Sequence, residues 1–339
     1  MIPLIRENQS LKRSNTFAID VNAKYFAEIN SIADLSALLA GQEIQTEALL
    51  IVGGGSNILF TKDFEGLVIK MNIQGITVTE SGAEVFVTAG AGVNWHELVQ
   101  FCVAHGFAGI ENLSLIPGTV GASPIQNIGA YGVELKDVFY SCEAMEIATG
   151  DTRTFHYEDC HFGYRESVFK SALKGKYIIT SVCYRLSKVA HLNTQYGAIT
   201  AELERRNILE PTIADVSAVV ADIRVSKLPD PSTIGNAGSF FKNPVIDAEE
   251  FAPVLAAFPE VVHYPAGPDQ VKVAAGWLIE SCGFKGMVSG NTGTWKNQAL
   301  VLVNHGGATG AEVYNFSETI IETVQAKFGI RLEREVNIL

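Results

Sequence analysis

The sequence predicts a chain of mixed strands and helices that folds into two or three globular units. The chain has 339 residues, and domains commonly hold about 100–200 residues. Hydrophobic residues make up 47% and charged residues 18%, which is an ordinary globular composition rather than that of a disordered chain, a collagen or a coiled coil. Strand-like and helix-like patterns of apolar residues then follow one another along the chain.

The first third of the chain is mostly strand-like. Leu49–Val52 is an apolar run that ends at three glycines, and Leu67–Ile69 and Val85–Val87 are similar runs bounded by glycine or polar residues. A helix is predicted from Asn94 to His105, because apolar residues recur there every three or four positions and Asn94 can cap the first turn. A helix with one apolar face has to bury that face, so we expect this helix to pack against a sheet.

A long loop and a domain boundary follow. Residues 109–132 hold five glycines and two prolines with almost no charge, which predicts a structured loop that touches a ligand. Tyr177–Leu186 is β-branched and aromatic and predicts a strand, and Thr212–Val225 carries one apolar stripe and predicts a helix. Pro229 and Pro231 end that helix, so we place a domain boundary there.

The rest of the chain alternates between helices and strands. The segment 330–339 alternates between apolar and polar residues and predicts a closing strand with Glu333 and Glu335 on its polar face. Before it we expect two short helices, a strand and a final helix, at Asp247–Phe258, Lys272–Cys282, Ala299–Val303 and Thr309–Phe328.

Charge and cysteine usage exclude several classes of function. The net charge of −12 repels nucleic acid and anionic membranes, so neither is predicted as a partner. The five cysteines form no C-x-x-C pair and the seven histidines show no metal-ligand spacing, which indicates reduced thiols and no metal site. Residues 1–17 lack the apolar core of a signal peptide, and no apolar stretch nears the roughly 18 residues of a membrane helix, so we expect a cytoplasmic protein.

Two glycine-rich segments suggest a nucleotide site. Residues 53–57, GGGSN, follow a strand like a dinucleotide phosphate loop, but the third glycine, the following helix and the distal acidic residue of that fingerprint are missing. A tight turn would explain this segment on its own. A second such loop at 116–132 favours a ligand site, since two loops could clamp one dinucleotide through backbone N–H groups.

Two other segments gather candidate catalytic groups. Residues 162–170 hold Arg165 and a lysine among aromatic residues, although from the residues alone a surface ion pair with Glu166 is favoured. Ser239 lies between Gly238 and two phenylalanines in a segment flanked by lysines, where we expect a buried proton donor. The G-x-S-x-G and H-E-x-x-H motifs are missing, which argues against hydrolases and metalloenzymes.

Several segments, taken in order, resemble one family. They are GGGSN (53–57), IPGTVGASPIQNIGAYG (116–132), GYRESVFK (163–170), TQYG (194–197), KLPDP and GNAGSFFKNP (227–244), AAGWLIE (274–280) and LEREV (332–336). With these segments the chain resembles the UDP-N-acetylenolpyruvoylglucosamine reductases, flavoenzymes that make UDP-N-acetylmuramate for bacterial peptidoglycan. TQYG is similar to the tyrosine loop of the type I branch. Two departures are Thr294-Trp295 in place of a Val-His pair and Arg334 in place of proline.

This resemblance implies a fold and a set of partners. The implied fold is an α+β FAD-binding fold of the p-cresol methylhydroxylase type, with two subdomains and a third α+β domain that binds the substrate. We expect the first subdomain at residues 1–75, completed by a C-terminal strand at 329–339, the second at 76–226, and the substrate domain at 227–328. The implied cofactors are non-covalent FAD and, as hydride donor, NADPH. A monomer in the bacterial cytoplasm is expected.

The resemblance also assigns site residues and no metal. The implied FAD contacts are Gly53, Gly55, Ser56, Asn57, Pro117, Gly118, Ser123, Ile125, Ile128 and Gly129. The implied contacts of the nucleotide-sugar substrate are Tyr164, Tyr196, Lys227, Asn243 and Gln298. The implied catalytic residues are Arg165, Ser239 and Glu335.

A mechanism follows from these assignments. The resemblance implies that NADPH reduces FAD and leaves, and that the flavin N5 then passes hydride to the methylene carbon of the enolpyruvyl ether. Arg165 and a neutral Glu335 would polarise the substrate carboxylate, and Ser239 would protonate C2. Two alternatives stay open. One is a sugar or lactone oxidase of the same fold, and the other is a nucleotide-sugar binding protein without catalysis.

Overall fold

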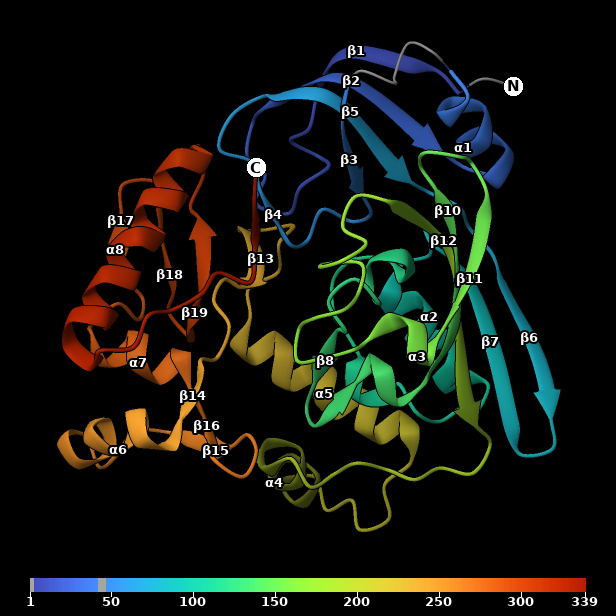
Figure 1. Cartoon of the computed structure of the whole chain (residues 1–339). Coiled ribbons are helices and arrows are strands. Elements are labelled where there is room, and N and C mark those ends of the chain that lie inside the picture. Colours follow the sequence, from blue (N-terminus) through green and yellow to red (C-terminus); the bar gives the residue numbers. More distant parts are fainter. Residues whose placement is uncertain (1–2, 42–46) are drawn as a thin grey trace. The chain divides into compact units, whose positions relative to one another are not determined.

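The chain divides into two compact units in the computed structural model, which describes residues 3–41 and 47–339 (Figure 1). Unit 1 comprises Met1–Gln9, Ala23–Gly54 and Glu65–Arg224, and unit 2 comprises Ser10–Asn22, Gly55–Phe64 and Val225–Leu339. The division into subdomains at 1–75, 76–226 and 227–328 stays a prediction. Residues 1–2 and 42–46 of the expected first subdomain lie outside the described residues.

Unit 1 begins with a sheet packed against α1. The strand order is β1-β2-β5-β3, with β3 parallel to β5, and the predicted strands at Leu49–Val52 and Leu67–Ile69 are confirmed. The apolar pattern did not predict α1. Ser31 caps this helix, because its hydroxyl accepts the N–H of Asp34 at 3.1 Å. The bounds are β1 (Ile5–Ser10), β2 (Asn22–Ile29), α1 (Ile32–Leu39), β3 (Ala48–Val52) and β5 (Phe64–Met71).

A second sheet in unit 1 is antiparallel and has the strand order β11-β10-β12-β7-β6. The predicted strands at Val85–Val87 and Tyr177–Leu186 are confirmed as parts of β7 and β12. The buried face of this sheet, α2 and the loops around them share one large apolar cluster. The bounds are β6 (Ile76–Ser81), β7 (Glu84–Gly90), β10 (Phe139–Glu146), β11 (Thr152–His156) and β12 (Tyr177–Ser187).

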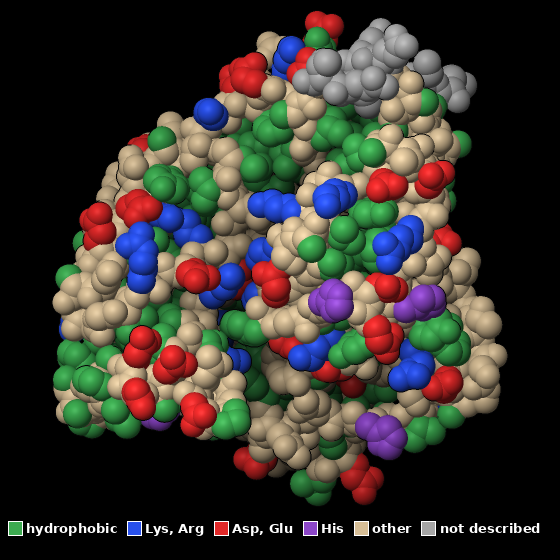
Figure 2. Space-filling model, viewed as in Figure 1, with side chains coloured by type: hydrophobic (Ala, Val, Ile, Leu, Met, Phe, Trp, Pro, Cys, Tyr) green, Lys and Arg blue, Asp and Glu red, His purple; other side chains and the backbone are tan. Residues whose placement is uncertain are grey.

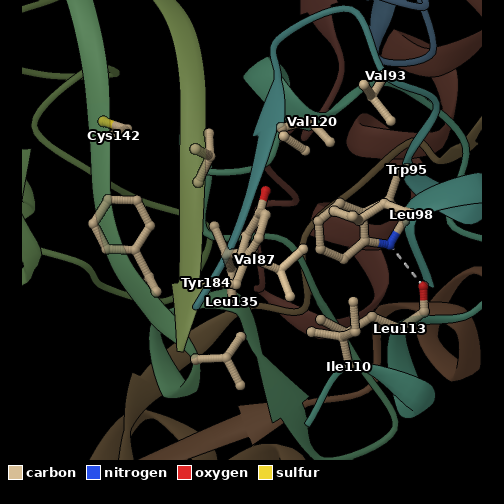
Figure 3. Close-up of a cluster of buried hydrophobic side chains, with 14 of the residues drawn as sticks. Val87, Val93, Trp95, Leu98, Ile110, Leu113, Val120, Leu135, Cys142 and Tyr184 are labelled. Atoms are coloured by element: carbon tan, nitrogen blue, oxygen red, sulfur yellow. Dashed lines mark hydrogen bonds between the residues drawn. The ribbon is translucent and has the colours of Figure 1, made fainter. Parts of the chain in front are cut away.

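The predicted helix after Asn94 is confirmed as α2 (Trp95–Ala104). The Asn94 side chain accepts the N–H groups of His96 and Glu97 at 2.9 and 3.2 Å, which caps the first turn. Trp95 is buried against Tyr184 of β12, with an edge-to-face ring distance of 5.7 Å (Figure 3). The Trp95 indole N–H donates to the Leu113 carbonyl at 2.8 Å, so α2 holds the loop that follows it (Figure 3).

The remaining elements of unit 1 surround the glycine-rich loop. The predicted helix at Thr212–Val225 is confirmed as α5, which packs its apolar stripe against α4. Arg206, the residue directly after α4, donates to Asp222 of α5 at 2.7 Å and so links the two helices. The bounds are β8 (Gly129–Ala130), β9 (Val133–Glu134), α3 (Tyr157–Cys160), α4 (Gly197–Arg205) and α5 (Ile213–Lys227), with 3₁₀ turns at Glu111–Leu113, Val120–Ala122 and Leu135–Asp137.

Unit 2 is built on a sheet with the order β13-β19-β18-β17, packed against α7 and α8. The predicted strand and the predicted last helix are confirmed as parts of β19 and as α8. Thr309 and Glu312 form a reciprocal capping box at the start of α8, and Gly329 ends the helix with φ of 73°. The bounds are β13 (Gly235–Ser239), β17 (Val288–Ser289), β18 (Thr292–Trp295), β19 (Gln298–Asn304) and α8 (Gly310–Phe328).

A small sheet in unit 2 corrects one prediction. Lys272 was expected to begin a helix, but it lies in β16, and the helix begins only at Ala275. β16 lies between β14 and β15 in this sheet, and α6 packs against β14 and β16. Figure 2 shows acidic side chains gathered over α6, whose first turn carries Glu249 and Glu250. The bounds are β14 (Val245–Asp247), α6 (Ala248–Ala257), β15 (His263–Pro265), β16 (Gln270–Val273) and α7 (Ala275–Ser281).

The closing strand expected at 329–339 is wrong in extent. Only β20 (Asn337–Ile338) pairs as a strand, in parallel with β4 (Ile58–Leu59). The alternating pattern of this segment nevertheless predicted correctly which side chains are buried, namely those of Ile330, Leu332 and Val336. The segment before β20 lies instead beside residues 240–242, with isolated backbone bonds rather than a regular ladder.

The structure of α8 predicts the effect of removing its cap. Thr309→Ala deletes the hydroxyl that accepts the N–H of Glu312, so we expect the free energy of unfolding of unit 2 to fall by about 1 kcal/mol in a urea titration. Thr319→Ala is the control, because Thr319 lies exposed in the middle of α8, and it should keep or slightly raise stability. Equal losses in both variants would contradict the capping role.

Candidate active site

The two glycine-rich segments meet within unit 1. The backbone of Gly54 lies so close to Gly118 that a Cβ on Gly54 would stand 3.0 Å from the Gly118 Cα. A Cβ on Gly53 would overlap the Thr119 hydroxyl. Gly54 is thus needed for the close approach of two backbones, and Gly53 for the fit of the Thr119 side chain. The structure confirms that the two loops are brought together, as the sequence suggested.

This cradle has the features that a dinucleotide needs. The Thr119 Oγ1 is buried and has no hydrogen-bond partner among residues 3–41 and 47–339. A buried hydroxyl without a partner is costly, and a bound phosphate or ribose group would satisfy it. Glycine-rich turns of this kind can present backbone N–H groups to an anion. The residues present therefore fit FAD, although Thr119 was not among the predicted contacts.

Residues 91–96, which lead into α2, hold the second glycine-rich loop through backbone hydrogen bonds. The backbone N–H of Trp95 donates to the Gly118 carbonyl at 3.1 Å. The N–H groups of Val120 and Gly121 donate to the carbonyls of Val93 and Ala91, at 2.9 Å each. Pro117 is exposed beside these bonds. The backbone of the loop thus follows the start of α2 closely, which fixes the conformation of its glycines.

The later part of the loop turns its side chains inward. The Ser123 hydroxyl donates to the Val120 carbonyl at 2.7 Å and lies 3.0 Å from the Tyr184 hydroxyl, so it is satisfied within the protein. Ile125 and Ile128 pack against the main apolar cluster. Any contact of Ser123 with a cofactor would therefore involve its backbone rather than its hydroxyl.

Arg165 bonds to the glycine-rich loop. Its guanidinium donates to the Gly129 carbonyl at 2.7 Å and lies 5.4 Å from the ring of Tyr164. Arg165 has a left-handed backbone with φ of 55°, held in a tight turn by paired bonds between Gly163 and Glu166. The sequence alone favoured an ion pair between Arg165 and Glu166, and the structure places the guanidinium on the loop carbonyl instead.

Tyr196 lies at the start of α4 and is exposed. Its ring meets the Tyr131 ring edge to face at 5.4 Å. Burial raises the pKa of Tyr131 above its ordinary value, while Arg224 beside it acts in the opposite direction. The tyrosine loop therefore contacts the end of the glycine-rich loop through the rings of Tyr196 and Tyr131, a contact that the sequence did not reveal.

In unit 2, Gly55 completes the first glycine-rich segment. It has φ of 64°, and a Cβ there would overlap the Ser14 carbonyl. The Asn15 side chain bridges the Leu11 carbonyl at 2.8 Å and the Ile19 backbone N–H at 2.9 Å, and shapes the turn that receives Gly55. The need for glycine at 55 therefore arises from the protein's own backbone as well as from any ligand.

The C-terminal segment brings two predicted catalytic residues of unit 2 together. The N–H of Glu335 donates to the Phe240 carbonyl at 2.8 Å, directly after Ser239. Asn57 donates to the Glu335 carbonyl at 3.3 Å and joins GGGSN to the same segment. Ser239 was expected to be buried, but it is exposed, because Phe240 and Phe241 take the buried positions instead. Ser56 is half-buried beside Asn57.

Three predicted substrate residues lie around the β18–β19 hairpin of unit 2. The Asn243 side chain accepts the N–H of Ala275 at 3.0 Å, and the Gln298 side chain accepts the N–H of Leu300 at 3.2 Å. Asn297 donates to the Ser226 carbonyl at 2.9 Å, which ties the hairpin to the residue before Lys227. Lys227 itself is exposed, so its ammonium group is accessible to a ligand.

Arg334 is a residue whose role the sequence did not show. It donates to the Ser317 hydroxyl at 2.8 Å and to the Glu318 carboxylate at 2.7 Å, and it lies over the Tyr314 ring at 4.4 Å. The hydrogen bond from Arg334 holds the pKa of Glu318 below its usual range. Arg334 thus anchors the segment that carries Glu335 to α8. The one feature of the sequence that could have pointed to this role is that Arg334 stands where the resemblance leads one to expect proline.

Within residues 3–41 and 47–339, no group of three or more His, Cys, Asp or Glu side chains is arranged to hold a metal ion. In the same ranges no helix is long and apolar enough to cross a membrane. All five cysteines are free thiols.

Two family models match the chain. The C-terminal domain of UDP-N-acetylenolpyruvoylglucosamine reductases matches residues 230–339, and an FAD binding domain matches residues 23–157. The first range covers Ser239, Asn243, Gln298 and Glu335, and the second covers both glycine-rich loops.

Curated relatives are similar over nearly their whole length. The UDP-N-acetylenolpyruvoylglucosamine reductase of Flavobacterium johnsoniae is 50% identical over 337 residues, which are 99% of this chain and 99% of the relative. The enzyme of the same name from Chromobacterium violaceum is 48% identical over 336 residues, 98% of each chain.

A solved structure shares the fold. The crystal structure of UDP-N-acetylenolpyruvylglucosamine reductase from Thermus caldophilus matches with a TM-score of 0.65, over 100% of this chain and 99% of that one, at 22% identity. Together with the FAD binding domain, this match confirms the predicted α+β FAD-binding fold of the p-cresol methylhydroxylase type.

The cradle predicts the result of adding one methyl group. Gly53→Ala forces a Cβ onto the Thr119 hydroxyl, and overpacking of this kind typically costs about 1–3 kcal/mol. We expect FAD affinity to fall roughly 5- to 100-fold, measured by the absorbance ratio of flavin to protein after gel filtration. Gly197→Ala is the control, because a Cβ at Gly197 meets nothing within 4 Å. Full flavin content in Gly53→Ala would remove this cradle from the cofactor site.

Proposed function

The chain belongs to the UDP-N-acetylenolpyruvoylglucosamine reductase family, and from this premise we propose that it reduces the enolpyruvyl ether of UDP-N-acetylglucosamine to UDP-N-acetylmuramate with NADPH. It is an FAD-containing oxidoreductase of peptidoglycan synthesis. The observation that carries the proposed mechanism is the backbone bond between Glu335 and Phe240, because it pairs the backbone of Glu335 with the residue that directly follows the exposed Ser239.

The glycine-rich loops are proposed to hold the cofactor. When bound, FAD supplies a hydride equivalent that it takes from NADPH. The backbones of Gly53, Gly118 and Gly129 and the unsatisfied hydroxyl of Thr119 support this assignment. The loop contains no His or Cys between residues 53 and 57, so the cofactor is held without a covalent link there, unlike in many sugar oxidases.

Arg165 and Glu335 are proposed to hold the carboxylate of the substrate. Reduction of the enolpyruvyl group places negative charge on C2 and on the adjacent carboxylate, and this charge must be stabilised. Arg165 is always cationic and already presents its guanidinium to a carbonyl oxygen. Glu335 contributes as a neutral acid that donates a hydrogen bond, since an ionised carboxylate would repel the substrate.

Ser239 is proposed to deliver the proton to C2. A hydroxyl is a weak acid, but the enolic carbon that it would face is strongly basic. Gly238, with φ of 68°, turns the chain just before Ser239. The buried rings of Phe240 and Phe241, which contact each other, anchor the chain just after Ser239. The exposure of Ser239 supports this role, because a proton donor has to reach its substrate.

The nucleotide is proposed to bind through polar groups of the hairpin and the tyrosine loop. Lys227 supplies the charge for the diphosphate, while Asn243, Gln298, Tyr164 and Tyr196 supply hydrogen bonds and ring contacts. Asn243 and Gln298 each accept a backbone N–H through the side-chain oxygen, and their amide N–H groups are proposed to donate to the ligand. We also propose that the enzyme acts as a monomer in the bacterial cytoplasm, where NADPH and nucleotide sugars occur.

One experiment tests the function as a whole. The purified protein is mixed anaerobically with NADPH and then with UDP-N-acetylglucosamine enolpyruvate, while the flavin absorbance is followed. We expect NADPH to bleach the yellow colour and the enolpyruvate to restore it. A colourless protein would favour a binding protein, and a flavin that the enolpyruvate fails to reoxidise would favour an oxidase with another substrate.

Lys227→Ala should weaken binding of the nucleotide sugar and reduce its dependence on salt, because a cation that contacts phosphate is removed. We expect the dissociation constant to rise by roughly tenfold or more by calorimetry, and FAD content to stay unchanged. Lys285→Ala is the control, since Lys285 is an exposed lysine of unit 2 that pairs with Glu280 at 2.8 Å. An unchanged constant in Lys227→Ala would exclude Lys227 from the site.

Ser239→Ala should separate the two half-reactions. The half-reaction with NADPH needs no proton at C2 and should stay within a small factor of wild type. The half-reaction with the enolpyruvate should slow by roughly 10²–10⁴-fold, the contribution of a positioned general acid. Ser239→Cys, which still carries a proton, should recover part of the rate. Stopped-flow absorbance measures both, and equal slowing of the two would mean that Ser239 only supports its loop.

A further inference from the structure

Leu115 stands at the start of the predicted cofactor loop in an unfavourable conformation. Its φ is 58°, in the left-handed region that a residue with a Cβ avoids. Such a backbone persists only where its surroundings hold it. Residues 116–118, the first part of the cofactor loop, follow directly. The conformation of Leu115 therefore sets the direction in which the loop leaves it.

Two side chains hold the Leu115 backbone, one on each side. The Nδ1 of His96, on α2, accepts the Leu115 N–H at 3.0 Å. The Nε of Arg224, on α5, donates to the Leu115 carbonyl at 3.1 Å. Both side chains and the loop belong to unit 1. The donor and the acceptor of this residue are thus both satisfied by side chains, an arrangement that specifies one conformation.

The bond from Leu115 to His96 depends on the protonation state of the imidazole. Nδ1 can accept a hydrogen bond only when it carries no proton, so His96 must be neutral with its proton on Nε2. Burial lowers the pKa of His96 below its ordinary value of 6.5, and the positive charge of Arg224 from α5 lowers it further, while Glu97 on α2 opposes this. His96 is therefore neutral at pH 7.

The other bonds that hold this loop do not titrate in the same range. The Trp95 backbone N–H bonds to Gly118 at 3.1 Å and its indole N–H bonds to Leu113 at 2.8 Å (Figure 3). Neither the amide nor the indole changes its charge between pH 5 and pH 8. Protonation of His96 thus removes one restraint on the loop while these neighbouring restraints stay in place.

We propose that His96 is a positioning residue for FAD: in its neutral form it locks Leu115 and so directs the backbone of residues 116–118 toward the cofactor, and in its protonated form it releases them. This inference rests on the proposed cofactor site. The sign follows from the neutral form being the one that holds the loop. Retention of FAD is complete above the pKa of His96 and is lost as the pH falls through it.

Three variants of the holoenzyme test this role. His96→Asn keeps an acceptor oxygen near the place of Nδ1 and cannot be protonated. His96→Leu removes the acceptor, so the partly buried N–H of Leu115 loses this hydrogen bond. His105→Asn is the control, since His105 is an exposed histidine at the end of the same helix. Each holoenzyme is diluted at pH 8 and at a series of lower pH values, and the fluorescence of released FAD gives the release rate.

The expected pattern separates the variants. Wild type and His105→Asn should release FAD roughly 10-fold faster below the pKa of His96 than at pH 8, the effect of one lost hydrogen bond to a partly buried N–H. His96→Asn should release slowly at every pH of the series, and His96→Leu quickly at every pH. If His96→Leu fails to fold, the comparison of wild type with His96→Asn still decides.

Two results would overturn the inference. One is an equal pH dependence in wild type and His96→Asn, and the other is a folded His96→Leu that retains FAD like wild type. Failure of the proposed function would look different, because the enolpyruvate would then fail to reoxidise the flavin at any pH while the release rates could still follow His96. Reoxidation by the enolpyruvate together with release rates that ignore His96 would reject this inference alone.

Discussion

The approach of two backbones without side chains between them is the constraint on which the candidate cofactor site depends. Gly53 and Gly54 lie against Gly118 and Thr119, and a single Cβ would separate them. The loop can come this close because segment 91–96 binds its carbonyl and N–H groups, and because Trp95 and His96 hold its start. The same closeness leaves the Thr119 hydroxyl buried without a partner, a cost that a bound ligand would remove.

The catalytic groups of unit 2 depend on a different device, a short stretch of backbone pairing. Residues 333–335 bond to residues 240–242 without forming a regular ladder. Arg334 adds an ion pair and a ring contact with α8 and so holds the segment from its far side. A proline at this position would stiffen the backbone, whereas arginine ties it to the helix. Both choices would restrain the neighbouring Glu335.

The sequence predicted the regular elements well where one face of the pattern was apolar. α2, α5 and α8 were predicted because their apolar stripes, caps and terminal glycine or proline residues agree. α1 was missed because its eight residues are too few to show a period. The closing strand was overextended, since alternation reports which residues are buried and does not report whether a neighbouring strand is available.

The sequence by itself determined the family, the need for glycine in both loops and the identity of the candidate catalytic residues, because these are properties of residue types in a fixed order. Only the tertiary structure decided that Ser239 is exposed, that Arg165 binds a loop carbonyl rather than Glu166, and that His96 and Arg224 hold Leu115. These facts depend on contacts between residues far apart in the chain. Hydrogen bonds of that kind are set by distances and angles in the folded state, and no local pattern of residues encodes them.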